Sequence, residues 1–325
     1  MPALTIGADV GGTKIAAGIV DPAGVVLARR LSHAHAGQPP AVVIAAIQEL
    51  VSDMLAQSGI ASSDLAAVGV GFPGYTHGAM GRVLMSSNLP GWDNYPLRDR
   101  LRELLGLPVI LDNDCNCAAW GEYRFGAGRG SRYMCYVTFS TGFGAGIVLD
   151  GKVYAGATGT AGEVGHTVVD PDGPLCSCGR RGCAMSYACG LAISRMACER
   201  VRAGEPTLLR DYCGPSPAHL SGEVVAQAAQ QGDRVAREVL AKAGRYFGLG
   251  LVTVIQVLNP DRIVIGGGLA RIGPLLMDPC LQALREYIHP VILEATRVVP
   301  SELWDDAGMI GAAALAWEQV GGGFS

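Results

Sequence analysis

Three polar side chains, Asp112, Asn113 and Asp114, directly follow the apolar residues 109–111. In open α/β sheets, ligand-binding groups collect where strands end, so carboxylates at this place could bind a cation or take a proton. One of the acids could instead cap the helix that we expect to begin near Cys115, because Asp is a favoured N-cap residue. Capping does not easily explain both acids, and at least one of them is a candidate for chemistry.

Glycine-rich turns occur at residues 7–14, 140–146 and 266–268. Glycine leaves backbone N–H groups accessible, so the first two turns could clamp a triphosphate and the third could let adenosine lie against the backbone. In the first turn, Asp9 stands where Mg²⁺ or its waters could be met. Any one of these turns taken alone could be a simple hairpin, but three of them in one chain favour a nucleotide site.

Two other phosphate-binding patterns do not fit the sequence. The turn at residues 7–14 is no Walker loop, because Thr13 and Lys14 come after the glycines and no helix is expected to follow. Residues 69–74 match the GxGxxG pattern, but Pro73 and the lack of a prompt helix do not fit a dinucleotide-binding unit. We therefore expect no dinucleotide site at residues 69–74.

Three cysteines, Cys176, Cys178 and Cys183, lie within eight residues, and His166 precedes the first of them by ten positions. Three thiolates and one imidazole suit a closed tetrahedral Zn²⁺ site, which would be structural because it leaves no open position for catalysis. The other seven of the 10 cysteines are scattered through apolar stretches. Buried free thiols are therefore the alternative, but the tight spacing with intervening glycines favours the metal site.

The expected strands and helices fall into two halves that repeat one plan. In the first half we expect strands at residues 4–8, 14–20, 25–30, 66–72 and 109–111, and helices at 40–57 and 97–105. In the second half we expect strands at 133–140, 145–149, 153–155, 262–265 and 291–298, and a helix at 275–287 after further helices. A final helix at residues 307–320 could return to the first half. The hinge between the halves is expected near residues 113–119.

The length and composition predict an ordinary globular protein. A chain of 325 residues with 49% hydrophobic content can bury a large core and forms two domains more naturally than one. The formal net charge is -4 and no Lys/Arg-rich run occurs, so we expect no nucleic-acid partner. Asp9 interrupts any secretory segment, and no apolar run of about 18 residues follows. We therefore expect a cytoplasmic protein with reduced thiols and no membrane segment.

Three motifs occur in order along the chain. They are Asp9-Val10-Gly11-Gly12-Thr13-Lys14, Asn113-Asp114-Cys115-Asn116-Cys117-Ala118-Ala119 and Gly162-Glu163-Val164-Gly165-His166. With the cysteine cluster and the terminal helix, they resemble the ROK family of sugar kinases and repressors over nearly the whole chain. The resemblance implies an α/β fold of two actin-like (ribonuclease H-like) domains with a cleft between them. We expect residues 1–113 with 306–325 to form the small domain, and residues 114–305 the large one.

The resemblance also implies an activity, the ATP-dependent phosphorylation of a glucose-type hexose at a primary hydroxyl such as the 6 position. It makes Asp114 the catalytic base and implies a homodimer or homotetramer. Sugar hydroxyls would be bound by Asn88, Asn113, Asp114, Glu163 and His166. Mg²⁺ and ATP would be bound by Asp9, Gly11, Gly12, Thr13, Lys14, Thr141, Gly142, Gly267 and Gly268. Structural zinc on His166 and the three cysteines would hold the loop that carries Glu163.

The sequence departs from the family pattern at Met185, where the family has a glutamate that reads the sugar near its anomeric end. A sugar hydroxyl left buried without that partner would cost about 1 to 3 kcal/mol of binding. A modified sugar or a cyclitol is therefore an alternative substrate. Water or another residue could also replace the glutamate.

Two functions without kinase activity are the alternatives. A repressor of the same family would need a DNA-binding segment ahead of the phosphate turn, and we expect none because Asp9 is close to the start of the sequence. A sugar-sensing protein without catalysis is the second, and Asp114 together with two phosphate turns speaks against it. The sequence leaves open which sugar is used and whether polyphosphate could replace ATP.

Overall fold

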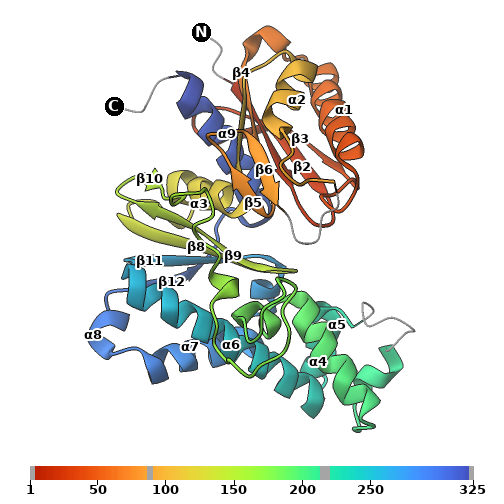
Figure 1. Ribbon diagram of the computed structural model, residues 1–325, viewed down its shortest axis with the longest axis vertical. Helices are drawn as coiled ribbons and strands as arrows, with labels where there is room; N and C mark the ends of the chain where they lie inside the picture. The colour runs from red at the N-terminus through yellow and green to blue at the C-terminus, as the bar shows by residue number, and fades with distance from the viewer. Residues whose placement is uncertain (1–3, 86–90, 213–219, 322–325) are drawn as a thin grey trace. The chain divides into compact units, whose positions relative to one another are not determined.

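The computed structural model of the chain describes residues 4–85, 91–212 and 220–321. The chain divides into two compact units, and Figure 1 draws both as ribbons. Unit 1 consists of Met1–Tyr136, Ala145–Gly162 and Ser301–Ser325, and unit 2 consists of Val137–Gly144 and Glu163–Pro300. The domain division proposed from the sequence, after residues 113 and 305, stays a prediction.

Unit 1 is built on a five-stranded sheet with the order β3-β2-β1-β4-β7. Its strands are β1 (Leu4–Val10), β2 (Ile15–Val20), β3 (Val26–Ser32), β4 (Leu65–Phe72) and β7 (Val109–Asn113). Strands β1, β2 and β3 pair antiparallel, whereas β4 runs parallel to both β1 and β7. All of β2 is buried because helices pack against it from both faces, while the edge strand β3 alternates between exposed and half-buried residues.

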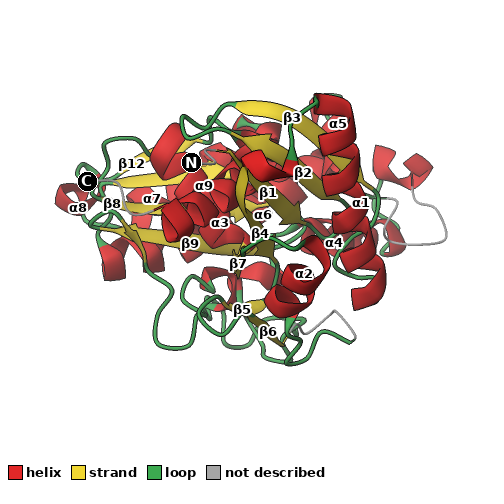
Figure 2. Ribbon diagram, turned by 90° about the horizontal axis from the view of Figure 1, so that it is seen from above, coloured by secondary structure: helices red, strands yellow, loops and turns green. Residues whose placement is uncertain are grey.

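Four helices are described in unit 1, and two of them cover opposite faces of the sheet. The helices are α1 (Pro40–Ser58), α2 (Leu97–Leu105), α3 (Asp114–Phe125) and α9 (Ala307–Gly321). Ile6 and Ala8 of β1 share a buried cluster with Ile47 of α1. Gly7 lies between them on the strand and therefore faces the other way, toward α9. Figure 2 shows β1 and β2 with α1 on one side and α9 on the other.

Helix α9 rests directly on the sheet because two strand residues that face it have no side chain. A Cβ at Gly7 of β1 would lie 1.8 Å from the carbonyl oxygen of Met309, and a Cβ at Gly69 of β4 would lie 1.8 Å from that of Ala312. Both distances are far below contact distance, so only glycine permits this approach. The terminal helix thus joins the first sheet, as the sequence predicted.

Among the described helices, α1 is the one whose length and apolar composition would allow it to cross a membrane. The prediction that no apolar run of this length follows the N-terminus was therefore wrong. Val43, Ile47, Leu50 and Met54 of this helix are buried in the cluster beneath β1 and β2. A helix that packs its apolar side chains against a sheet in this way is what the core of a globular unit requires.

The second sheet has the order β10-β9-β8-β11-β12. Its strands are β8 (Tyr133–Phe139), β9 (Phe143–Leu149), β10 (Lys152–Val153), β11 (Arg262–Gly266) and β12 (Arg297–Pro300). Counted along the chain, both sheets follow the strand order third, second, first, fourth, fifth, apart from the hairpin described below. The predicted α/β fold with a repeated plan is therefore confirmed. The helices of unit 2 are α4 (Gly190–Arg202), α5 (Gly222–Gln230), α6 (Arg234–Leu258), α7 (Pro274–Tyr287) and α8 (Pro290–Leu293).

Two parts of the secondary structure differ from the prediction. The strand expected at residues 291–298 is a helical turn, α8, followed by the shorter strand β12. Pro290 occupies the first helical turn and the His289 side chain accepts a hydrogen bond from the backbone N–H of Val291, so the apolar run begins as a helix. The hairpin β5 (Tyr75–His77) and β6 (Arg82–Met85) was not predicted.

Candidate functional site

The acidic residues of unit 1 gather where the strands of its sheet end. Asp9 of β1 is in register with Gly71 of β4, and Gly71 is in register with Asp112 of β7. A Cβ at Gly71 would lie 3.4 Å from the Cα atom of Asp114 and 3.3 Å from the Sγ atom of Cys117. The strand ends and the first turn of α3 therefore lie close together, with Asp9, Asp112 and Asp114 in one acidic cluster.

The polar side chains at the end of β7 hold the backbone and the start of α3. Asn113 is the N-cap of α3, because its Oδ1 accepts the backbone N–H groups of Cys115 and Asn116, and its Nδ2 donates to the carbonyl of Gly74. Asp112 Oδ1 accepts from the N–H of Asn113 at 2.7 Å and from Asn116 Nδ2 at 2.8 Å. The capping that was considered for an acid is thus performed by Asn113, and Asp112 supports it.

Asp114 begins α3, where the helix dipole favours a negative charge. One of its oxygens, Oδ1, accepts the N–H of Cys115 at 2.9 Å. Burial nevertheless raises the pKa of Asp114, and hydrogen bonds from Cys115 and Asn113 oppose this rise. A carboxylate whose pKa is moved toward neutrality is suited to accept a proton.

Burial also raises the pKa of Asp9, to about 7, with a further rise from the nearby Asp114 and a smaller opposing effect of Lys14. A Cβ at Gly308 would lie 2.7 Å from Asp9 Oδ2, so this carboxylate lies against the first turn of α9. Two half-buried carboxylates that repel each other are oxygen ligands of the kind that bind a divalent cation such as Mg²⁺. The arrangement fits the predicted role of Asp9.

The first glycine turn, predicted to bind phosphate, is closed by a hydrogen bond from the N–H of Gly11 to the carbonyl of Lys14, at 2.9 Å. Gly12, Thr13 and Lys14 are exposed, and a Cβ at Gly12 would meet no atom within 4 Å. The backbone of this turn is therefore open to an anion. It follows Asp9 directly, so unit 1 brings the predicted Mg²⁺ residue and the predicted phosphate residues together.

Unit 2 places its predicted nucleotide residues at one end of its strands. Thr141 is exposed and Gly142 half-buried in the turn after β8, and the N–H of Gly190, the first residue of α4, donates to the carbonyl of Ser140. Gly267 has φ +88°, and a Cβ there would lie 2.5 Å from the carbonyl oxygen of Phe139. Gly267 thus packs against the end of β8, while Gly268 has open space where a Cβ would be.

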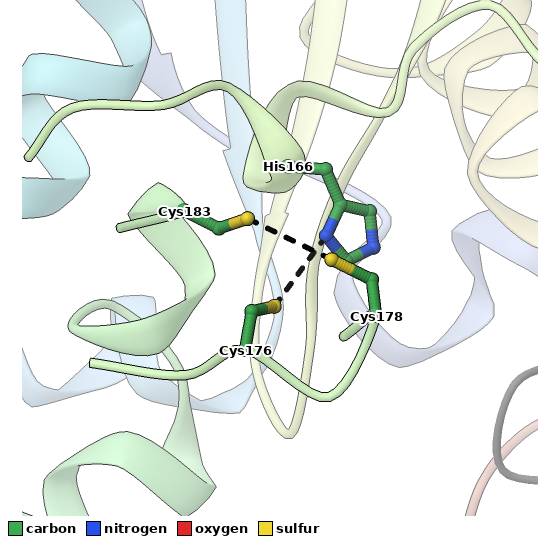
Figure 3. Close-up of side chains that lie close together, drawn as sticks. All are labelled: His166, Cys176, Cys178 and Cys183. Carbon is green, nitrogen blue, oxygen red and sulfur yellow. Dashed lines mark hydrogen bonds between the residues drawn. The ribbon is translucent and has the colours of Figure 1, made fainter. Parts of the chain in front are cut away.

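The four predicted metal ligands lie together in unit 2, and Figure 3 shows their side chains pointing toward one point. Their ligand atoms are all within 4.8 Å of one another. His166 Nδ1 lies 3.6 Å from Cys176 Sγ, and Cys178 Sγ lies 3.7 Å from Cys183 Sγ. Zn–S bonds of about 2.3 Å and Zn–N bonds of about 2.0 Å require tetrahedral edges of roughly 3.5 to 3.8 Å. The residues present fit a zinc ion.

The two ring nitrogens of His166 face different groups. Nδ1 faces the thiols, whereas Nε2 lies 3.8 Å from Glu163 Oε2. Burial lowers the pKa of His166, which favours the neutral ring that a metal ligand needs. The structure therefore brings Glu163 and the cysteine cluster together through His166.

One predicted site residue lies outside the described part of the chain, and two contacts near the site were not predicted. Asn88 lies outside the described residues. Trp92 and the close approach at Gly71 were missed, although Gly91-Trp92 is a conspicuous pair in the sequence. Their partners are distant along the chain, so no local pattern indicates them.

Comparison with known proteins connects these features to one family. The ROK family profile matches residues 5–319. The chain is 35% identical over 322 residues to a glucokinase of Streptomyces coelicolor, covering 97% of this chain and 98% of that protein. It is 34% identical over 313 residues to an N-acetylmannosamine kinase of Yersinia pseudotuberculosis, covering 95% and 96% of the two chains.

Among solved structures, a ROK family glucokinase from Streptomyces griseus in complex with glucose and AMPPNP superimposes with a TM-score of 0.84. It is 37% identical in sequence, and the match covers 97% of this chain and 99% of that one. This protein is a member of the ROK family.

Proposed function

We propose that this protein is a sugar kinase that transfers the γ-phosphoryl group of ATP to a hydroxyl of a hexose, with glucose as the first candidate and hexose 6-phosphate as the product. The observation that carries the proposal is the half-buried Asp114 directly after β7, in one cluster with Asp9, which an open glycine turn follows. The similarity to glucokinases along nearly the full length supports it.

In the proposed reaction the acceptor hydroxyl attacks the γ-phosphorus. A new oxygen–phosphorus bond forms while the bond to the bridging β–γ oxygen breaks, and ADP leaves. Asp114 takes the proton of the attacking hydroxyl, and its raised pKa brings the carboxylate closer to the basicity that this step needs. Mg²⁺, when bound, offsets the charge of the phosphates, and Asp9 would hold it or its waters.

The remaining residues would orient the two substrates. We assign the sugar hydroxyls to Asn113, Glu163 and His166, together with Asn88. The phosphates are assigned to the turn of Gly11, Gly12, Thr13 and Lys14 and to Thr141 and Gly142, and adenosine to Gly267 and Gly268. Holding the reactants in line can supply about 7 to 11 kcal/mol of the barrier reduction. Domain closure over the sugar, a cytoplasmic location and a homodimer or homotetramer belong to the same proposal.

We assign a structural Zn²⁺ to His166, Cys176, Cys178 and Cys183. The donor set leaves no open coordination position, and the spacing of the ligand atoms fits a tetrahedral ion. The site would fix the ring of His166 and thereby the position of Glu163, which faces its other nitrogen.

A modified sugar or a cyclitol is a second candidate substrate because Met185 stands where the family has a glutamate. Met185 is half-buried in a 3-10 turn, Ala184–Ser186, that begins directly after Cys183. A thioether gives a hydroxyl no strong acceptor, and the similarity to an N-acetylmannosamine kinase shows that relatives use amino sugars. If the pocket is built around Met185, Met185→Glu should lower kcat/KM for the true substrate. The same change should raise kcat/KM for glucose if an unmodified hexose fits the wild-type pocket poorly.

The direct test is ADP release measured over a panel of hexoses, amino sugars and cyclitols with Mg²⁺-ATP, and with polyphosphate as an alternative donor. A sugar kinase releases ADP only when its acceptor is added. A sugar-sensing protein without catalysis would bind a sugar, shown by calorimetry, and release no ADP with any of them.

A further inference from the structure

Trp92 is a completely buried side chain whose indole N–H holds the segment next to the phosphate turn. The N–H is shared by two backbone carbonyls, those of Ala36 at 3.1 Å and Gln38 at 3.2 Å. The N–H of Ala36 in turn donates to the carbonyl of Gly11 at 3.0 Å. Gly11 closes the phosphate turn through Lys14, so one chain of hydrogen bonds runs from the indole to that turn.

The ring of the same side chain contacts the acceptor side of the site. Its centroid lies 4.4 Å from that of Phe72, the last residue of β4. Phe72 is in register with Asn113 of β7, which caps the helix that begins with Asp114. The polar edge of Trp92 therefore supports the ATP side of unit 1, and its apolar face supports the side on which the hydroxyl would be activated.

We propose that Trp92 is a positioning residue that sets the phosphate turn relative to the Asn113–Asp114 strand end, and this rests on the proposed kinase function. A buried indole needs a hydrogen-bond partner, and a partner anywhere would satisfy it. Here both acceptors belong to the segment 36–38, whose Ala36 N–H donates to the carbonyl of Gly11. The packing and the hydrogen bond act on two different halves of the site, so they can be separated by mutation.

The test uses two variants that each remove one half of this connection. Trp92→Phe keeps an aromatic ring but removes the N–H, and should raise the KM for ATP about tenfold while the KM for the sugar stays within about twofold. Phe72→Leu keeps the N–H but removes the ring contact, and should lower kcat and raise the sugar KM while leaving the ATP KM unchanged.

Thr5→Val is the matched control, because Thr5 Oγ1 donates one buried hydrogen bond to the carbonyl of Ala313 elsewhere in unit 1. It removes a similar bond without contact to the phosphate turn, and should leave both KM values unchanged. The proposal would be contradicted if Trp92→Phe and Phe72→Leu each changed the KM for ATP and the KM for the sugar equally. It would also be contradicted if Thr5→Val changed these values as the two site variants do.

Amide hydrogen exchange tests the connection without relying on turnover. In Trp92→Phe, exchange of peptides covering residues 10–14 and 33–38 should speed up at least fivefold relative to wild type, with no such change in Thr5→Val. Unchanged exchange would overturn the positioning role even if the kinase assay succeeds. Accelerated exchange in a protein without sugar-dependent ADP release would instead refute only the proposed function. If Trp92→Phe does not fold, the indole ¹⁵N–¹H resonance of Trp92 in the wild type should shift with AMPPNP, and an unmoved resonance contradicts the proposal.

Discussion

At the scale of single residues, the site is a cluster of half-buried carboxylates that are costly to ionise together. Burial and the neighbouring Asp114 raise the pKa of Asp9 to about 7. The unfolded chain has the ordinary value near 3.8. An acid whose pKa is higher in the folded than in the unfolded state stabilises the fold at low pH, where it carries its proton. This contribution to the free energy of unfolding is lost as the pH rises through the folded-state pKa. The free protein is thus less stable near neutral pH because of the residue that is proposed to hold Mg²⁺.

Asp9→Asn should therefore stabilise the protein in the absence of nucleotide. The gain should be small at pH 4, grow up to about pH 7 and reach a few kcal/mol above it, because one pKa unit corresponds to about 1.4 kcal/mol. Urea unfolding between pH 4 and 8 measures this. Asp53→Asn, an exposed change on α1, should show no such pH-dependent gain, and a destabilised Asp9→Asn at pH 8 would contradict the account.

At the scale of elements, glycines decide how closely helices approach the sheet. The strand β4 can lie under α9 only because Gly69 carries no Cβ, and Gly71 leaves the space that Asp114 and Cys117 occupy. These glycines look like a dinucleotide motif in the sequence. Their function in the fold is close packing, which positions the two helices that flank the acidic cluster.

Gly69→Ala should lower the free energy of unfolding by about 3 kcal/mol, because the new Cβ would lie 1.8 Å from the carbonyl oxygen of Ala312 and α9 would have to move. Gly142→Ala is the matched control, since a Cβ there meets no atom within 4 Å, and should change stability by less than about 0.5 kcal/mol. Denaturant unfolding of both variants is the measurement. Equal stabilities of the two variants would show that α9 does not need this approach.

The loop that carries Cys176, Cys178 and Cys183 is a second such element, and its position is proposed to depend on a bound zinc ion. We expect about one zinc ion per chain in the purified protein. Cys178→Ser should lose the metal and weaken sugar binding at least about tenfold, because Glu163 loses its support through His166. Metal analysis and calorimetry measure both effects. Cys280→Ala, which removes a buried thiol outside the cluster, should keep metal and sugar affinity; unchanged affinity in a zinc-free Cys178→Ser would disprove the coupling.

At the scale of the whole molecule, the sequence predicted what depends on local pattern. The apolar strands of both sheets, the helices at residues 40–57, 97–105 and 307–320 and the grouping of His166 with three cysteines follow from periodicity, glycine turns and cysteine spacing. The strand predicted at residues 291–298 was wrong because a short apolar run fits a strand and a helical turn equally well. The acidic cluster, the bond of Ala36 to Gly11 and the contacts of Trp92 join segments far apart in the chain, so only the folded structure shows them.

Asp114 is proposed to take the proton of the acceptor alcohol, and the kcat of Asp114→Asn measured beside that of Asp112→Asn tests this role most directly. Both variants remove a half-buried carboxylate beside Asn113, but the Asp112 carboxylate holds Asn113 and Asn116 by hydrogen bonds. Asp114→Asn should fold, bind nucleotide and lose at least about 100-fold in kcat, as expected for a missing general base. Asp112→Asn should stay within about tenfold of wild type. An Asp114→Asn enzyme that turns over sugar at a near wild-type rate would contradict the account.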